Sequence, residues 1–407
     1  MRRYRHLGTV LTDRSRIYAA SFLRALANGL AGVMLGIYIA KLGLSVVVLG
    51  AVLSAGLAGA TLAAGIMTFG GDRFGRRRAL LVLGGLSAAG GAVVALASDA
   101  WLIAAAAFFG MLTGMGKDRG AMLALESAAL PSTTDNAGRT RVFAWHAVMQ
   151  DVGQALGGML AALPALLRKL GVAGELGSYR AAILVYAVLT VASLPLYASL
   201  SSSCEAGAGA ARKPLTPQSR SILARICALF ALDGIGGGFL GSALFSYFFF
   251  AWFGASETQI AALFLVGRIM SAVSHLAAAW LAARIGLVNT MVFTHIPSSL
   301  LLVAIPFAAN FWVAAMLYLL REGLAEMDVP TRTSYVMAVV EPDERTFASG
   351  ATGIARLASW AVAPAVAGLT IEAMSLAMPL FIAAGLKITY DILLYAAFRR
   401  IKPPEER

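Results

Sequence analysis

Ionisable residues lie inside segments that are otherwise apolar and long enough to cross a lipid bilayer. A charged side chain at the bilayer centre costs at least about 2.5–3.5 kcal/mol, so such residues rarely face lipid. They predict a polar cavity inside a helical bundle. For any one residue the alternative is a structural ion pair, because Lys387 and Asp391, and also Asp328 and Arg332, are spaced i,i+4. The residues expected near mid-depth are Asn28, Asp151, Asp233, Arg268, Arg321, Arg356 and Lys387.

Further polar side chains extend this expected cavity, and two carboxyl groups are candidates for proton binding. Asp233 has no basic residue within one helical turn, and burial of a carboxyl group away from cations favours its protonated form. The glycines that follow it allow the segment to bend. We therefore predict that Asp233 binds and releases protons, with Asp151 as the second candidate. The alternative is that Asp233 only packs against the first segment near Asn28. The other candidates for the cavity wall are Arg24, His146, Gln150 and Gln154.

Arginine and lysine outnumber carboxylates among the mid-depth residues, mainly in the second half of the chain. Arginine binds carboxylate or phosphate through two parallel hydrogen bonds, so the excess indicates an anionic solute. His146 and His275 have no partner ligand at i,i+4, and Cys204 and Cys227 lack metal-ligand spacing. We therefore expect neither a metal site nor a cofactor.

The composition explains why these charges need a helical bundle around them. The chain of 407 residues is 59% hydrophobic and 13% charged, with a mean hydropathy of +0.77. A soluble domain is about 25% charged, because its surface faces water. The formal net charge of +12 arises mostly from residues between the apolar segments. There they fix the topology and contact anionic lipid headgroups, which argues against nucleic acid as the partner.

Apolar segments of about 20 residues predict about twelve membrane-spanning helices and an all-α fold. We expect a six-helix bundle over 1–200, a cytoplasmic linker over 201–221 and a second six-helix bundle over 222–407. The expected spans are 17–40, 46–69, 79–98, 101–125, 142–166, 179–200, 222–252, 258–283, 288–308, 311–339, 347–371 and 376–398.

The distribution of Lys and Arg predicts the orientation. Most basic residues fall on one side, and only Lys41, Arg168, Lys169 and Arg180 fall on the other. This asymmetry places both termini in the cytoplasm and the chain in the cell (inner) membrane. The basic N-terminus is not followed by a short apolar stretch and a small-residue cleavage site, so we expect the first span to be retained.

The two halves carry similar short motifs in the same order. Residues 28–32, Asn-Gly-Leu-Ala-Gly, correspond to residues 233–237, Asp-Gly-Ile-Gly-Gly. Residues 72–75, Asp-Arg-Phe-Gly, have a weaker counterpart in Ala-Arg-Ile-Gly at 283–286. Such repeats are typical of transporters that bind their solute between two halves.

The sequence Gly-Asp-Arg-Phe-Gly-Arg-Arg-Arg at 71–78 resembles the loop signature of the major facilitator superfamily, although Thr68 replaces its leading glycine. The resemblance implies a fold of two six-helix bundles that rock to give alternating access. It also implies a cytoplasmic gate in which Asp72 contacts a helix N-terminus and a nearby Arg. Residues 117–120 loosely resemble a basic feature of proton-coupled members; the alternative is a charge network beside Asp72. The expected gate residues are Asp72, Arg73, Gly75, Arg76, Asp118, Arg119, Glu126, Asp328 and Arg332.

Small residues at 153–158, and more clearly Ser359, Ala363, Pro364, Ala367 and Gly368, resemble the antiporter signature of the same family. Helix packing is the alternative interpretation of both.

These features predict a secondary transporter, because the chain has no P-loop to power transport with ATP. Our leading prediction is proton-coupled efflux of a drug-like compound or metabolite by a monomer. A proton-coupled importer or uniporter of a nutrient is the alternative. A membrane enzyme should show a clustered catalytic set and a receptor should carry an appended soluble domain, and we find neither. The expected partners are a small-molecule substrate, protons and lipid.

Overall fold

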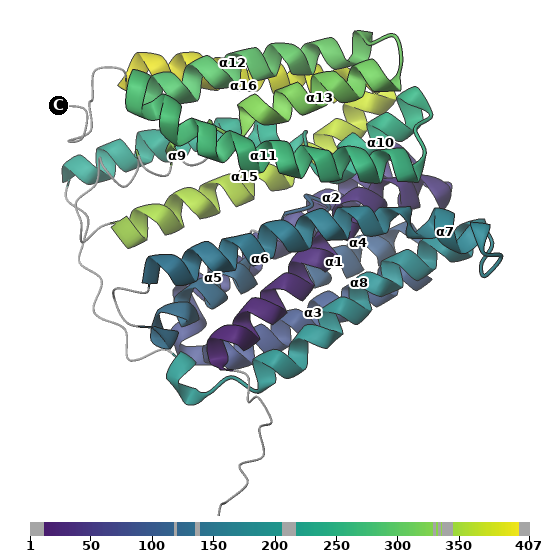
Figure 1. Cartoon of the computed structure of the whole chain (residues 1–407), viewed down its shortest axis with the longest axis horizontal. Helices are drawn as coiled ribbons and strands as arrows, with labels where there is room; N and C mark the ends of the chain where they lie inside the picture. The colour runs from purple at the N-terminus through teal and green to yellow at the C-terminus, as the bar shows by residue number, and fades with distance from the viewer. Residues whose placement is uncertain are drawn as a thin grey trace, which may run out of the picture.

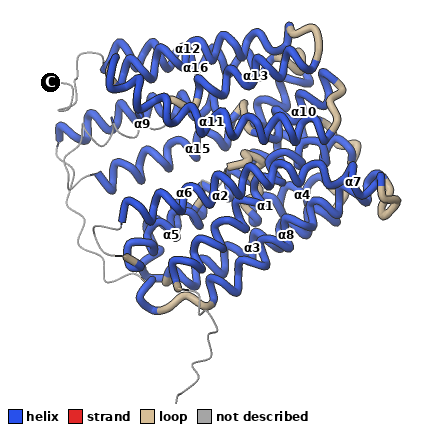
Figure 2. Tube along the Cα trace, viewed as in Figure 1, coloured by secondary structure: helices blue, strands red, loops and turns tan. Residues whose placement is uncertain are grey.

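The computed structural model describes residues 12–117, 120–134, 139–205, 217–328, 331–332, 335 and 345–398. All regular structure in this described part is helical, and no strand appears there (Figure 2). The all-α prediction is confirmed. The first half contains α1 (Asp13–Lys41), α2 (Val46–Phe74), α3 (Arg76–Leu96), α4 (Ala100–Gly110), α5 (Ala121–Ala129), α6 (Arg139–Met159), α7 (Leu163–Lys169) and α8 (Glu175–Ala198). The second half contains α9 (Pro217–Gly238), α10 (Ser242–Phe253), α11 (Glu257–Ile285), α12 (Leu287–Ala304), α13 (Phe311–Ala325), α15 (Arg345–Ala373) and α16 (Met378–Phe398).

The exterior of the bundle is apolar, as a surface in contact with lipid requires. Trp101, Phe307 and Trp312 are 85%, 77% and 69% exposed. Nine helical stretches of the described chain are long and apolar enough to cross a membrane. The number of twelve spans stays a prediction, since α4 is short and residues 329–344 lie almost entirely outside the described part.

Two expected spans are interrupted rather than continuous. Residues 111–120 separate α4 from α5, and residues 239–241 separate α9 from α10. Gly114 and Gly116 have φ angles of 62° and 69°, which L side chains rarely adopt. The two interruptions contact each other, since Ala243 N donates to Gly114 O at 2.9 Å. Hydropathy could not predict these breaks, because irregular backbone is tolerated at membrane depth where protein surrounds it.

The helices of the two halves form two groups that meet along α2 and α15 (Figure 1). The backbone N–H of Ala365 donates to Ser54 Oγ at 2.9 Å, and Leu57 packs with Leu357 and Trp360. Ala363 and Ala367 of the antiporter-like pattern are fully buried, and a Cβ on Gly368 would meet Val46 and Val47. These contacts favour helix packing as the explanation of that pattern.

The halves separate toward the end of the molecule where α2 ends and α15 begins. Ala64, Thr68, Gly350 and Gly353 line a cavity of about 910 Å³ there, open space included. At the opposite end Arg168 of α7 bonds to Glu257 of α11 at 3.0 Å and holds the halves together. Among the described residues, the two halves are therefore in contact at one end and separated by a cavity at the other.

Candidate functional site

A cavity of about 800 Å³, its open mouth included, lies between the two halves. Met115 and Lys117, in the interruption after α4, form its wall on the first half. On the second half its polar lining residues are Asp233, Ser242, Arg268, His295, Tyr318, Arg321, Glu322, Glu326, Asp328, Arg332, Arg356, Trp360 and Lys387.

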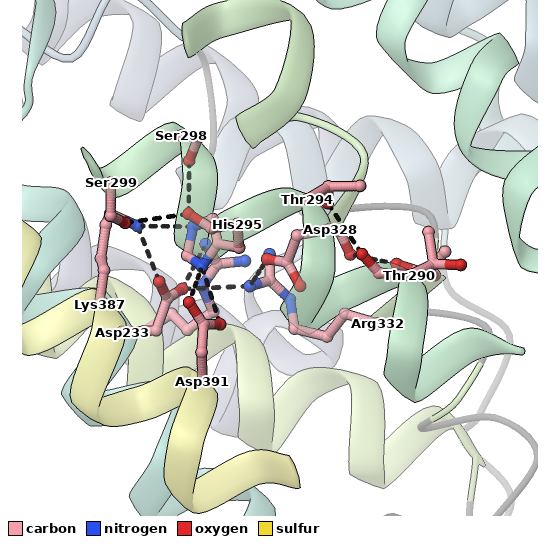
Figure 3. Close-up of polar contacts among 12 residues, drawn as sticks. Asp233, Thr290, Thr294, His295, Ser298, Ser299, Asp328, Arg332, Lys387 and Asp391 are labelled. Atoms are coloured by element: carbon pink, nitrogen blue, oxygen red, sulfur yellow. Dashed lines mark hydrogen bonds and ion pairs between the residues drawn. The ribbon is translucent and has the colours of Figure 1, made fainter. Parts of the chain in front are cut away.

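Asp233 of α9 is surrounded by cations (Figure 3). Its Oδ1 accepts from Lys387 Nζ of α16 at 2.9 Å, and its Oδ2 accepts from Arg332 at 3.1 Å. Arg356 of α15 lies 3.5 Å from the same Oδ2. Asp233 is 2% exposed, so these ion pairs compensate a carboxylate that has lost its water. The expectation that Asp233 is buried away from cations is wrong, because the three cations come from other helices.

His295 of α12 lies between Lys387 and Asp391 of α16 (Figure 3). Lys387 Nζ is 3.3 Å from His295 Nε2, and His295 Nδ1 is 3.0 Å and 3.1 Å from the two Asp391 oxygens. An ammonium group can only donate, so Nε2 is the acceptor and Nδ1 carries the proton that is donated to Asp391. The expected direct pair of Lys387 with Asp391 is thus replaced by a chain through His295. The expected pair of Asp328 with Arg332 is present, at 2.5 Å.

Positive charge exceeds negative charge in the cavity wall. The six cationic side chains are Lys117, Arg268, Arg321, Arg332, Arg356 and Lys387, and the four acidic ones are Asp233, Glu322, Glu326 and Asp328. Arg321 pairs with Glu322, and Lys117 bonds to Glu326 at 2.9 Å. Arg268 Nη2 is 3.5 Å from the carbonyl oxygen of Gly116, and no carboxylate of the described part is within ion-pair distance of it.

A second buried polar cluster lies inside the first half. Glu126 of α5 is fully buried; it accepts from Arg24 of α1 at 3.0 Å and from Tyr197 of α8. His146 Nε2 of α6 is 3.2 Å from Glu126, and Gln150 is 3.3 Å from His146 Nδ1. Glu126 is therefore part of the core of the first half. The sequence predicted that Glu126 belongs to a cytoplasmic gate. Its partners Arg24 and Tyr197 are 102 and 71 residues away in the chain, so its place in the core could not be predicted.

The other predicted cavity residues occupy different places. Arg24 and Asn28 line a separate pocket of about 530 Å³ within the first half. Gln154 is buried where α6 packs against α1, and its carbonyl oxygen is next to Gly29. Asp151, the second proton candidate, is exposed on α6 and is not among the residues that line the central cavity.

The predicted gate is only partly visible. The side chains of Asp72 and Arg73 and all of Asp118 and Arg119 lie outside the described residues. Gly75 caps α3 with a φ of 85°. The carboxylate at the start of α3 is Glu205, which accepts from the backbone N–H of Arg76 at 2.7 Å and of Arg77 at 3.3 Å.

Sequence reasoning missed His295 and Glu205. A signal for His295 existed, since Thr290, Thr294 and Ser298 recur every four residues and mark one polar face of the span. Nothing comparable marked Glu205, whose contact with Arg76 is 129 residues distant in the sequence.

No family model matches the chain. It is 24% identical to an uncharacterized membrane protein of Saccharomyces cerevisiae, over 95% of this chain and 94% of that protein. Among solved structures it is similar to the nucleoside transporter NupG, with a TM-score of 0.73 and 15% identity over 96% of this chain and 100% of that one. It also resembles the D-xylose-proton symporter (TM-score 0.68, 14% identity, 95% and 97% covered) and the human organic anion transporter MFSD10 (0.59, 17%, 94% and 99%).

These likenesses show that the chain has the fold of major facilitator superfamily transporters. At such identities they show the fold alone. The apolar helices and the membrane-protein relative agree on a multi-pass membrane protein.

Proposed function

We propose that this chain is a secondary transporter that carries a small organic anion, coupled to protons, by alternating access. The observation that carries the proposal is the excess of cations in the central cavity, with Arg268 outside any ion pair of the described residues. A guanidinium group in a cavity shielded from water binds carboxylate or phosphate strongly, because the hydrogen bonds are charge-assisted. Arg268 is the principal anchor for the anion in this proposal.

Arg321 and Arg356 complete the proposed anion site, but both already interact with a carboxylate. Arg321 already pairs with Glu322, and Arg356 lies 3.5 Å from Asp233, so each would exchange part of an existing interaction for the anion. In the sequence Arg356 has no acid at i±3 or i±4, but in the structure Asp233 approaches it from another helix. Arg268 therefore takes first place among the three arginines.

Alternating access requires an opening that moves from one end of the cavity to the other. With both termini in the cytoplasm, as the sequence predicts, the open end faces the cytoplasm and the Arg168–Glu257 pair closes the outer end. Transport would then need this pair to break while α2 and α15 close over the cytoplasmic end.

The direction of transport follows from how the proton and the anion affect each other's binding. A proton bound at the cavity wall adds positive charge and so favours an anion beside it, and by linkage the anion favours the proton. This supports joint transport of the two, which is import under an inward proton gradient. Efflux in exchange for protons, the leading prediction from the sequence, requires the two to displace each other, and it remains our second candidate.

The anion site is tested by a ligand screen followed by a single substitution. Purified protein is heated with small carboxylates, sulfonates and phosphates, and with neutral and cationic analogues, because a bound ligand raises the unfolding temperature. For an anion that stabilises the protein, Arg268→Gln should lower affinity by roughly 10- to 100-fold, since a charge-assisted hydrogen bond contributes about 1.5–3 kcal/mol. Stabilisation by neutral or cationic compounds only would contradict the proposal.

The control for Arg268→Gln is Arg284→Gln. Arg284 is exposed and stacks on Trp280 at 4.0 Å, away from the central cavity, so it tests the loss of an arginine without loss of the site. Direction is measured in proteoliposomes of known orientation. An acidic exterior should accelerate anion uptake for joint transport, and it should accelerate anion release from loaded vesicles for exchange.

A further inference from the structure

We propose that the pair of His295 and Asp391 binds the transported proton. This inference rests on the proposed proton coupling and assigns it to residues other than Asp233. His295 lines the cavity while being 2% exposed, and Asp391 behind it is fully buried. A proton from the cavity therefore meets His295 first, and Asp391 only through it.

Asp233 is poorly placed to take up a proton, and Asp391 is better placed. Asp233 accepts from Lys387 and Arg332 and lies beside Arg356, so an added proton would have to displace a cation. Asp391 is bonded to His295, and no Lys or Arg of the described part is within ion-pair distance of its oxygens. A proton can join this pair without breaking an ion pair.

The ion-paired groups around His295 are balanced before the proton arrives. His295 contacts Lys387, Tyr390 and Asp391 of α16, and it shares the cavity wall with Asp233 of α9, Arg268 of α11, Arg321 and Glu322 of α13, Arg356 of α15, and Asp328 and Arg332. With His295 neutral, Asp233, Asp328 and Asp391 offset Arg332, Arg356 and Lys387, and Glu322 offsets Arg321, which leaves Arg268 as the cation in excess. One added proton adds a second positive charge to that of Arg268, and an anion in the cavity is then bound more strongly.

The same geometry links proton binding to the cavity through Lys387. In the neutral pair, His295 Nε2 accepts a hydrogen bond from Lys387 Nζ. A proton that binds Nε2 removes this acceptor, and Lys387 must turn away from the imidazolium. Lys387 also lines the cavity, so proton binding makes one more ammonium group available to the anion.

The first test follows the histidine directly and needs no substrate. The full chain, labelled with ¹⁵N-histidine, is placed in lipid nanodiscs and titrated between about pH 5 and about pH 9, the range in which histidine changes charge. His295→Gln identifies the His295 signals by their loss. We expect His295 to gain a proton within this range, and Asp391→Asn to remove that step from the range. A His295 signal that stays unchanged over the whole range would overturn the proposal.

The second test measures coupling with benzenesulfonate, an organic anion whose charge is constant over this pH range. His295→Gln and Asp391→Asn should lose at least tenfold in gradient-driven accumulation while keeping exchange at equal pH. His146→Gln removes a similarly buried histidine that is paired with Glu126, and it should keep gradient-driven accumulation. Gradient-driven accumulation at the parental rate in His295→Gln would refute the assignment. Failure of the parent chain to carry any of the screened anions would instead refute the proposed function, and the titration would still report on His295.

Discussion

The two halves each contain a buried histidine that is paired with a carboxylate, but only one of these pairs is next to the central cavity. In the first half Glu126 binds His146, Arg24 and Tyr197 from three different helices, and Glu126 and His146 line neither the central cavity nor the smaller pocket. In the second half His295 lines the central cavity with Lys387 and Asp233. The two clusters therefore differ in their access to the cavity. The Glu126 cluster joins helices, whereas the His295 cluster is the one that we propose exchanges protons and contacts the solute.

The two clusters also differ in the number of partners that their charged residues have. Glu126 interacts with both Arg24 and His146, so its loss removes a negative charge from two buried side chains at once. In the second half the cations have more than one interaction: Arg332 also pairs with Asp328, and Lys387 also contacts His295. Redundant partners allow one interaction to break during a transport cycle while the helices stay packed.

The largest effect that we predict concerns the first half. Glu126→Gln should lower the free energy of unfolding by about 3–5 kcal/mol, because it breaks a fully buried ion pair with Arg24, which is 4% exposed. The measurement is thermal or denaturant unfolding in nanodiscs. Lys41→Gln, in an exposed pair with Glu175, is the matched control and should unfold like the parent chain. Equal stability of Glu126→Gln and the parent would remove the structural interpretation of this cluster.

A smaller effect on stability and a large one on transport are expected for Asp233→Asn. The substitution removes the negative charge that pairs with Arg332, Arg356 and Lys387, but Arg332 keeps its ion pair with Asp328 and Lys387 keeps its hydrogen bond to His295. Gradient-driven transport should fall by about 100-fold, which corresponds to about 2.7 kcal/mol. Affinity for benzenesulfonate should rise by about tenfold, because one competing negative charge is gone.

Tighter binding together with lost transport is what distinguishes this prediction from simple damage to the fold. Equilibrium binding and proteoliposome flux are measured on the same preparation of Asp233→Asn. If binding and flux fall in parallel, Asp233 contributes to the anion site in some other way and the contrast between the two clusters weakens.

The sequence predicted the helical fold and most helix positions, because bilayer thickness and hydropathy determine them almost alone. It also predicted the pair of Asp328 with Arg332, since an i,i+4 spacing brings such residues together on one helix. It could not predict that Lys387 reaches Asp233 across 154 residues, or that Arg24 reaches Glu126 across 102. Inside a membrane a charge requires a partner, but hydropathy does not say which helix provides it.

The smallest predicted effect concerns the loop after α2, where the motif at 71–78 predicts a gate residue at Asp72. Glu205 accepts from two backbone N–H groups at the start of α3, and a carboxylate there also interacts favourably with the helix dipole. Glu205→Gln keeps one acceptor but loses the charge, so unfolding should become easier by about 0.5–1 kcal/mol and transport should persist.

Asp72→Asn is the variant with which Glu205→Gln should be compared. The family resemblance assigns Asp72 to a contact that forms in one state of the gate, so this variant should fold normally and lose most of its transport. If Glu205→Gln loses transport while Asp72→Asn retains it, Glu205 is the carboxylate on which gating depends. The gate would then connect the start of α3 to the segment after α8, because Glu205 lies beyond the end of α8 and Arg76 begins α3. That connection joins the linker to the first half, so opening at this end would be governed by the contact of the linker with one bundle as well as by the contact of α2 with α15.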